Sequence, residues 1–297
     1  MALVQLKKSL HVSLTRCQSK FAMFGRKNKI EIKTPAQFDK MRVAGLVVAD
    51  ILERLRNESG VGVTTADLDR IAREELVKRG ATPSFLGYYG YPSVICSSVN
   101  DEVVHAIPNP RPLQDGDILS IDFGAIVDGW HGDSAITIEI GAPVSAHTKL
   151  SDTTRESMWA GLAQAQAGNK ISDISHAVEA VLRSGDNYGV LEEYGGHGIG
   201  TKMHMDPFVP NFGAPGHGLD LVVGMALAIE PMATLGSRHV KTLADDWTVV
   251  TVDGSYASHW EHTVAITEQG PWVLTAHDGG AEYFAAHGIS SPASAKN

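Results

Sequence analysis

The fold of this chain is decided by the stretch LSIDFGAIVDGWHGD, residues 119–133. Two runs of β-forming residues around an Asp-Gly pair are the strongest local signal of a two-residue β-hairpin. With the turn at Asp128-Gly129, Gly124 pairs with Asp133 on the opposite strand. Side chains alternate between the faces of a strand, so Asp122 lies on the face of Gly124, diagonal to Asp133 and within its reach. We expect Gly124, which lacks a side chain, to leave the space between the two carboxylates open.

Two carboxylates on one face of a hairpin repel each other, and like charges so placed are destabilising. A cation between Asp122 and Asp133 would remove this repulsion. A metal pair is therefore one interpretation of the hairpin, but for the hairpin alone two solvated aspartates at the edge of a sheet are the more frequent explanation.

The composition limits the classes of function. With 297 residues, of which 43% are hydrophobic, the chain can bury a large core. Seven basic residues and no acidic residue precede Glu31, which leaves 18 basic against 34 acidic residues in the rest, a balance near −16. Such a body is not expected to bind nucleic acid or an anionic membrane over a broad surface. No apolar run approaches the roughly 20 residues of a membrane helix, and two cysteines form no disulfide framework, which favours the reducing cytoplasm.

The two ends of the chain differ from its body. Residues 1–29 form a basic leader that we expect to be a disordered arm; a targeting segment or a contact with an anionic partner such as ribosomal RNA has the same composition. Residues 286–297 are small and polar, and we expect this tail to be frayed.

The body is predicted to be one catalytic domain over residues 30–285, built from related halves at about 34–140 and 147–277. In the first half, helices open at Thr34-Pro35 and near Thr65, and a strand-like run covers 94–104. In the second half, helices are predicted over 148–167 and 172–185. Segments 62–68 and 168–174 share a glycine, an aspartate and an apolar residue at a constant offset of 106, the separation of Asp67 and Asp173.

Polar residues interrupt apolar surroundings at three further places, around His197 and His204, at Glu230, and at Glu261. Each carboxylate alone is more often a strand-end residue that reaches water, but carboxylates seldom enter a core unless they are paired or bound to metal. Two aspartates (Asp122 and Asp133), two glutamates and one of these histidines together give an oxygen-rich set with a single imidazole. Such a set suits a pair of divalent ions better than one tetrahedral zinc.

The order of these motifs resembles the type I methionine aminopeptidases over residues 34–277. The matching runs are GYYGYP (87–92), SVNDEVVHAIP (98–108), 122–133, 196–207, IEPM (229–232), DDWTV (245–249) and WEHT (260–263). The resemblance implies the α+β pita-bread fold, with two pseudo-symmetric halves that each have antiparallel strands covered by helices. This agrees with the internal repeat.

The resemblance also implies a dinuclear site for two divalent ions, Co, Mn, Fe or Zn. Asp122 would chelate one metal, Asp133 and Glu261 would bridge both, and His204 and Glu230 would complete the other. A hydroxide between the metals would attack the first peptide bond of a nascent protein with a small second residue, and Glu230 would carry the proton.

The substrate contacts implied by the resemblance are one histidine and an apolar pocket. His105 would hydrogen-bond the substrate near the scissile amide. The methionine side chain would contact a set of residues that are mostly aromatic: Phe85, Tyr88, Tyr91, Cys96 and Trp247.

The chain departs from the pattern of many members at several positions. Seven places after His204, a second substrate-contacting histidine is replaced by Asn211, whose amide can still donate a hydrogen bond. Phe85 and Tyr89 replace a cysteine and a histidine. We expect His131 to support the carboxylates or to be purely structural, and His197 to serve loop geometry; His259 and His262 should face opposite ways, with His262 away from the metals.

Two other functions remain open. A proline-directed relative, an aminopeptidase P or prolidase, would use the same metal set, although those enzymes usually carry a large N-terminal domain. A non-catalytic binding scaffold of the same fold would have no reason to keep repelling carboxylates. The interval of 26 residues between His204 and Glu230 leaves no room for the helical insertion of the type II enzymes. We expect a monomer whose partners are the N-terminal methionines of nascent chains and, through the leader, the ribosome.

Overall fold

The computed structural model describes residues 30–186 and 188–295, so the predictions for the leader lie outside the described residues. The predicted hairpin is confirmed as β4 (Ile118–Val127) and β5 (Trp130–Glu139), with Gly124 opposite Asp133. At the turn, Asp128 and Gly129 have φ angles of 49° and 79°. Left-handed backbone at both central positions is what an Asp-Gly turn supplies at little cost.

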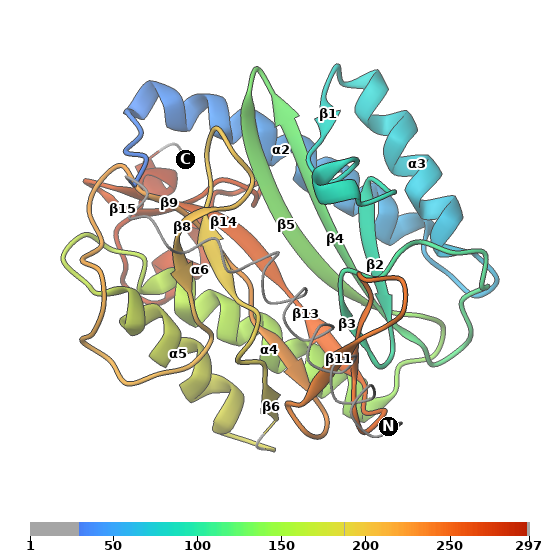
Figure 1. The fold of residues 1–297 in the computed structure, drawn as a ribbon. Helices are drawn as coiled ribbons and strands as arrows, with labels where there is room; N and C mark the ends of the chain where they lie inside the picture. Colours follow the sequence, from blue (N-terminus) through green and yellow to red (C-terminus); the bar gives the residue numbers. More distant parts are fainter. Residues whose placement is uncertain (1–29, 187, 296–297) are drawn as a thin grey trace, which may run out of the picture.

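The hairpin is the centre of a large antiparallel sheet (Figure 1). Within the described part of the chain, this sheet has nine strands. Seven of them follow the order β1-β4-β5-β14-β9-β7-β8, and the other two, β2 and β15, pair with β4 and β14. The strands other than the hairpin are β1 (Thr82–Pro83), β2 (Ile95–Val99), β7 (Gly196–Gly198), β8 (Met205–Val209), β9 (Ala226–Ile229), β14 (Glu261–Thr267) and β15 (Gly270–Val273).

Two three-stranded sheets complete the β-structure. One has the order β13 (Ala257–His259), β10 (Met232–Thr234), β6 (Gly189–Val190), and the other β11 (Val240–Thr242), β12 (Val249–Thr251), β3 (Glu102–Val104). The run predicted as one strand over 94–104 is therefore two strands, β2 and β3, that belong to different sheets. Asn100 turns the chain between them with φ 62°, a conformation that asparagine tolerates.

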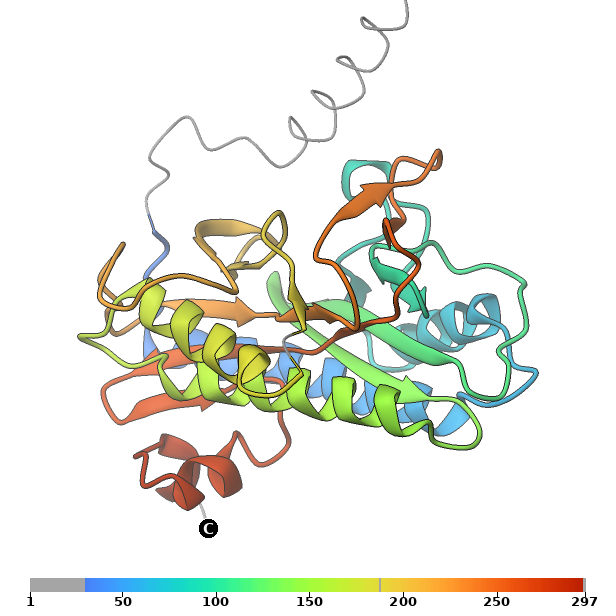
Figure 2. The ribbon, with the colours of Figure 1, turned by 90° about the horizontal axis from the view of Figure 1, so that it is seen from below.

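Four long helices cover one face of the large sheet, α2 (Pro35–Glu58), α3 (Thr65–Lys78), α4 (Ser145–Ala163) and α5 (Ile171–Arg183), and the smaller strands and loops rise from the other face (Figure 2). Thr34 caps α2 through a capping box with Gln37, as the Thr-Pro signal predicted. α3 and α5 begin 106 residues apart, and at each start an aspartate, Asp67 or Asp173, accepts a bond from the backbone N–H of the N-cap residue. The internal repeat thus appears as two equivalent helix starts. None of the described helices is long and apolar enough to cross a membrane.

Close packing of backbone on backbone fixes the hairpin against α2. A Cβ atom on Gly132 would lie 2.8 Å from the Gly45 backbone nitrogen in the middle of α2. A side chain at position 132 would therefore push the helix off the strand. Because Asp133 is the next residue, this contact also sets where its carboxylate lies.

The C-terminal segment packs against the body instead of fraying over its described part. After α6 (Ala281–Ala286) the described part of the chain ends in the short helix η2 (Pro292–Ala295). Ser291 is buried and its hydroxyl donates to the Pro271 carbonyl at 2.8 Å, and Ala293 is also buried. The small side chains that suggested a frayed tail are what allow residues 290–293 to lie flat against β15 beside Gly270.

Candidate metal centre

Four acidic side chains converge because four neighbouring strands of the large sheet each contribute one. Asp122 comes from β4, Asp133 from β5, Glu261 begins β14, and Glu230 follows β9. The pairing places these strands in one continuous order: β4 with β5, β5 with β14, β14 with β9. The structure therefore brings together the four carboxylates that the sequence predicted as metal ligands.

Three of these carboxylates have an oxygen atom with no hydrogen-bond partner within the described residues. They are Asp122 Oδ1, Asp133 Oδ1 and Glu261 Oε1, all shielded from solvent. The residues Asp133 and Glu261 are only 3% and 2% exposed. Buried polar atoms without partners are rare, since each costs on the order of 1–3 kcal/mol or more when charged. This donor set fits divalent cations, which would satisfy the unpaired oxygens.

Burial disfavours the charged form of all four groups in the metal-free protein. Burial raises the pKa values of Asp122, Glu230 and Glu261 well above their usual range, and the neighbouring negative charge of Asp133 raises them further. Burial also raises the pKa of Asp133 to about 7. A bound divalent cation would reverse these shifts, because it favours the ionised carboxylates.

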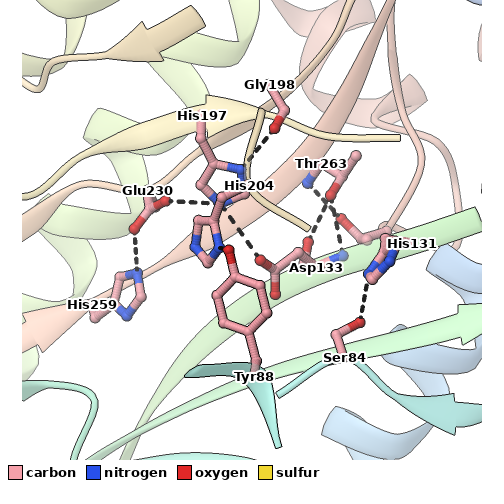
Figure 3. A network of polar contacts seen from close by, with 11 residues as sticks. Ser84, Tyr88, His131, Asp133, His197, Gly198, His204, Glu230, His259 and Thr263 are labelled. Atoms are coloured by element: carbon pink, nitrogen blue, oxygen red, sulfur yellow. Dashed lines mark hydrogen bonds and ion pairs between the residues drawn. The ribbon is translucent and has the colours of Figure 1, made fainter. Parts of the chain in front are cut away.

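His197 lies among the carboxylates. From the sequence, its expected role was to support the geometry of a loop. Its Nε2 atom lies 3.4 Å from Glu230 Oε1 and 3.7 Å from Asp133 Oδ2 (Figure 3). Asp133, His197 and Glu261 each offer a ligand atom, and these atoms lie within 4.8 Å of one another. The two glycines that flank His197 are the sequence signal that could have predicted its position near the carboxylates. Gly196 lies against the Ala228 backbone, so β7 can approach β9 closely.

His204, the imidazole ligand suggested by the resemblance, lies directly beside His197. The two ring centroids are 4.3 Å apart, and the His204 side chain is exposed to solvent. The His204 Nδ1 atom is 2.9 Å from the Tyr88 hydroxyl (Figure 3). This contact fixes the orientation of the ring, and the role of His204 as a ligand stays a prediction.

The space beside Gly124 is filled, contrary to the expectation that it would be open. A Cβ atom on Gly124 would lie 2.8 Å from Ser84 Cβ and 3.1 Å from Met203 Cε. Glycine is needed there because a neighbouring segment packs onto the hairpin. The Ser84 hydroxyl is also hydrogen-bonded to His131 Nδ1, at 2.9 Å. This bond orients the His131 ring on the carboxylate face of β5.

His262 is turned away from the carboxylates, as alternation along β14 predicted. Its Nδ1 atom lies 2.8 Å from Thr275 Oγ1 and 3.2 Å from Ser134 Oγ. Its ring also makes an edge contact with Trp159 on the helix-covered face of the sheet.

The aromatic residues predicted to hold the methionine side chain gather in one apolar cluster. Phe85, Tyr91 and Cys96 are buried, and Tyr88 and Trp247 pack against them partly buried. The Tyr91 and Trp247 rings meet edge to face with centroids 5.0 Å apart. Cys96 pairs with Asp122 across β2 and β4, which places this cluster beside the carboxylates.

His105 follows β3 with a left-handed φ of 61°, which is unusual for a residue with a side chain. Its ring makes an edge contact with Tyr194 at 5.7 Å between centroids. Burial lowers the pKa of His105 to about 4, so the ring is neutral near pH 7. A neutral imidazole offers one N–H donor, which suits a hydrogen bond to a peptide carbonyl.

Asn211 and His259 both contact Glu230. Asn211 is 1% exposed, and its Nδ2 atom donates to the Glu230 backbone carbonyl at 3.0 Å. His259 is 2% exposed, with Nε2 3.8 Å from Glu230 Oε2. A contact between Asn211 and substrate stays a prediction. Alternation had placed His259 on the face opposite to His262, which agrees with its position near Glu230, but had not identified Glu230 as its neighbour.

The comparisons with known proteins agree with this geometry. The profile of metallopeptidase family M24 matches residues 39–268. Methionine aminopeptidase 1 of Mycobacterium tuberculosis is 52% identical over 249 residues, 82% of this chain and 94% of that protein. The crystal structure of methionine aminopeptidase from Rickettsia prowazekii superposes with a TM-score of 0.82 at 36% identity, over 84% of this chain and all of that one.

A prolidase from Pyrococcus furiosus shares the fold alone, with a TM-score of 0.67 at 19% identity over 82% of this chain and 65% of that one. The resemblance seen in the sequence motifs is therefore confirmed over the folded body. With its four converging carboxylates, the chain belongs to metallopeptidase family M24 and, within it, groups with the methionine aminopeptidases.

Proposed function

We propose that this protein is a metal-dependent exopeptidase that removes the N-terminal methionine from nascent proteins and peptides with a small second residue. The observation that carries the proposal is the convergence of unpaired carboxylate oxygens from Asp122, Asp133 and Glu261 next to an apolar aromatic cluster. Divalent cations would satisfy the unpaired oxygens, and the cluster offers a surface for a thioether side chain. The close similarity to methionine aminopeptidases supports the choice of substrate.

Two divalent ions are proposed for the centre, held by Asp122, Asp133, His204, Glu230 and Glu261. Four carboxylates carry more negative charge than one ion would balance, which supports a pair of Co, Mn, Fe or Zn ions. Tyr88 contacts His204 at Nδ1, so Nε2 is the nitrogen proposed to bind metal. When bound, such ions polarise a peptide carbonyl and lower the pKa of water in the centre.

The residues of the chain orient the substrate and move the proton. Glu230 is proposed to carry a proton from water to the leaving amine, because its carboxylate is partly exposed, unlike those of Asp133 and Glu261. His105, neutral and held by its left-handed backbone, is proposed to donate to the substrate near the scissile amide. Asn211, which fixes the Glu230 backbone, is kept as a candidate substrate contact.

The partners and location are also proposals. The substrates would be new chains at the ribosome in the cytoplasm, and a monomer suffices because all the proposed ligands come from one chain. The seven basic residues of the leader, without an acidic residue before Glu31, support a contact with ribosomal RNA.

Chelation tests this function. Protein treated with EDTA should not release methionine from Met-Gly-Met, and Mn²⁺, Co²⁺, Fe²⁺ or Zn²⁺ added separately should restore release to different extents. Cleavage that persists after complete metal removal would contradict the mechanism. A preference for X-Pro peptides over Met-Gly-Met would favour a proline-directed relative. Metal binding without cleavage of either peptide would favour the binding scaffold.

A further inference from the structure

His259 is a buried histidine that the proposed mechanism leaves unused. It ends β13, and its Nε2 atom is shielded from solvent without a hydrogen-bond partner within the described residues. The polar atom that this nitrogen approaches is Glu230 Oε2, at 3.8 Å (Figure 3). A buried ring nitrogen without a partner is costly, so its direction toward a metal-binding carboxylate calls for an explanation.

The backbone of His259 is held by several hydrogen bonds, which fix the point from which its side chain extends. Its backbone N–H donates to Ser120 Oγ at 3.2 Å and to Thr137 Oγ1 at 3.1 Å. Thr137 Oγ1 in turn donates to the His259 carbonyl at 2.7 Å. Across β10 and β13 His259 pairs with Met232, two residues after Glu230. These contacts connect His259 both to the hairpin and to the segment that carries Glu230.

Glu230 is surrounded by three side chains that act on different atoms. Asn211 donates to its backbone carbonyl at 3.0 Å. His197 Nε2 lies 3.4 Å from Oε1, and His259 Nε2 lies 3.8 Å from Oε2. Each oxygen of the Glu230 carboxylate therefore has a different imidazole as its neighbour.

We propose that His259 is a positioning residue, which donates a hydrogen bond from Nε2 to Glu230 Oε2 and holds this carboxylate in its metal-binding orientation. The proposal rests on the proposed function for the roles of Glu230. At 3.8 Å the two atoms are too far apart for a hydrogen bond, but such bonds are often long before ligands bind and shorten afterwards. Residues that orient a metal ligand in this way typically change metal affinity or activity about 10–100-fold when they are replaced.

The test compares His259→Leu, which removes the donor, with His259→Gln, whose side-chain amide places a donor near the position of Nε2. Metal-free full-length protein is titrated with Mn²⁺ in a calorimeter, and kcat and KM are measured on Met-Gly-Met. His259→Leu should weaken Mn²⁺ binding and lower kcat, each about 10–100-fold, with KM changed less than about threefold. His259→Gln should recover most of both losses.

His262→Gln serves as the matched control, because this histidine is three residues away but is turned from the carboxylates. It should lower the melting temperature and leave Mn²⁺ affinity and kcat unchanged. If His259→Leu does not fold, His259→Asn replaces it, since the shorter amide does not reach Glu230. Its loss should then match that expected for leucine.

Two results would overturn the proposal. In one, the leucine (or asparagine) variant binds Mn²⁺ as the wild type does; in the other, His259→Gln is as impaired as that variant, which would mean that ring volume alone matters. Calorimetry measures Mn²⁺ binding without catalysis, so the two proposals can fail separately. If the wild type is inactive on Met-Gly-Met but the His259 variants still bind Mn²⁺ more weakly, only the proposed function is contradicted. An active wild type with unaffected variants would contradict the role of His259 alone.

Discussion

The charge of Asp133 depends on a cation, because this residue is 3% exposed and lies among the other carboxylates. Its folded pKa of about 7 lies above the roughly 3.9 of an unfolded chain, so the metal-free fold holds a proton that unfolding releases. The associated stability is present below about pH 4 and is lost as the pH rises through about 7. Asp133→Asn carries no titrating group at this position.

As the pH rises from about 4 to about 7 without metal, the wild type loses the stability contributed by the Asp133 proton, and Asp133→Asn does not. We therefore expect the free energy of unfolding of Asp133→Asn, relative to that of the wild type, to increase over this range by more than about 1 kcal/mol. Urea unfolding in EDTA at several pH values measures this difference. With Mn²⁺ present the order should reverse, because the variant loses a ligand. A difference independent of pH would mean that Asp133 does not titrate in this range.

The two neighbouring imidazoles His197 and His204 can be separated by substitution. If His204 is the ligand, His204→Ala should bind fewer Mn²⁺ ions and lose activity more than about 100-fold. His197→Ala should keep the number of ions with affinity lowered about 10–100-fold, since His197 contacts Glu230 and Asp133 but would not be a ligand. Calorimetric stoichiometry and metal analysis distinguish the two. The opposite pattern would assign the ligand to His197, whose nitrogen lies within 4.8 Å of ligand atoms of Asp133 and Glu261.

At the scale of elements, the contact of β5 with α2 is expected to control the metal centre. Gly132→Ala would place a methyl group 2.8 Å from the Gly45 nitrogen, and neither backbone can move easily. We expect a loss of several kcal/mol in stability and weaker Mn²⁺ binding, since Asp133 moves with its strand. Gly129→Ala is the control, because its Cβ meets open space and only the left-handed φ of 79° is penalised, by about 1 kcal/mol. Chemical unfolding measures the loss of stability, and calorimetry measures the Mn²⁺ affinity. Equal Mn²⁺ affinity in the two variants would show that the contact of β5 with α2 does not affect the metal centre.

The sequence could predict features that lie within one element, but not features that depend on the pairing of distant elements. The hairpin and its register were predictable because alternation and the Asp128-Gly129 turn act over neighbouring residues. The approach of His197 and His259 to Glu230 was not predictable, because β7 and β13 reach Glu230 only through the pairing of strands far apart in the sequence. The space beside Gly124 was also wrongly predicted, since Ser84 and Met203 fill it from other segments.

For the whole molecule, the uneven charge places a basic leader on an acidic body. The first described residues are fixed to the segment that follows His197. Lys33, 6% exposed, donates from Nζ to the Ile199 carbonyl at 2.6 Å, and Glu31 accepts from the Thr201 backbone N–H at 3.2 Å. The described body therefore begins beside the segment that links His197 to His204.

Deletion of residues 2–29 should leave kcat/KM on Met-Gly-Met unchanged, because the contacts of Glu31 and Lys33 remain. The same deletion should abolish co-sedimentation with ribosomes, which in the full chain should weaken steeply with salt, as contacts with phosphate do. A full-length variant with the seven basic leader residues changed to glutamine is the control, and it should lose co-sedimentation as the deletion does. If the neutral leader still binds ribosomes, the contact is not electrostatic. If the deletion lowers kcat/KM on the free peptide, the leader belongs to the catalytic unit rather than to a separate ribosome contact.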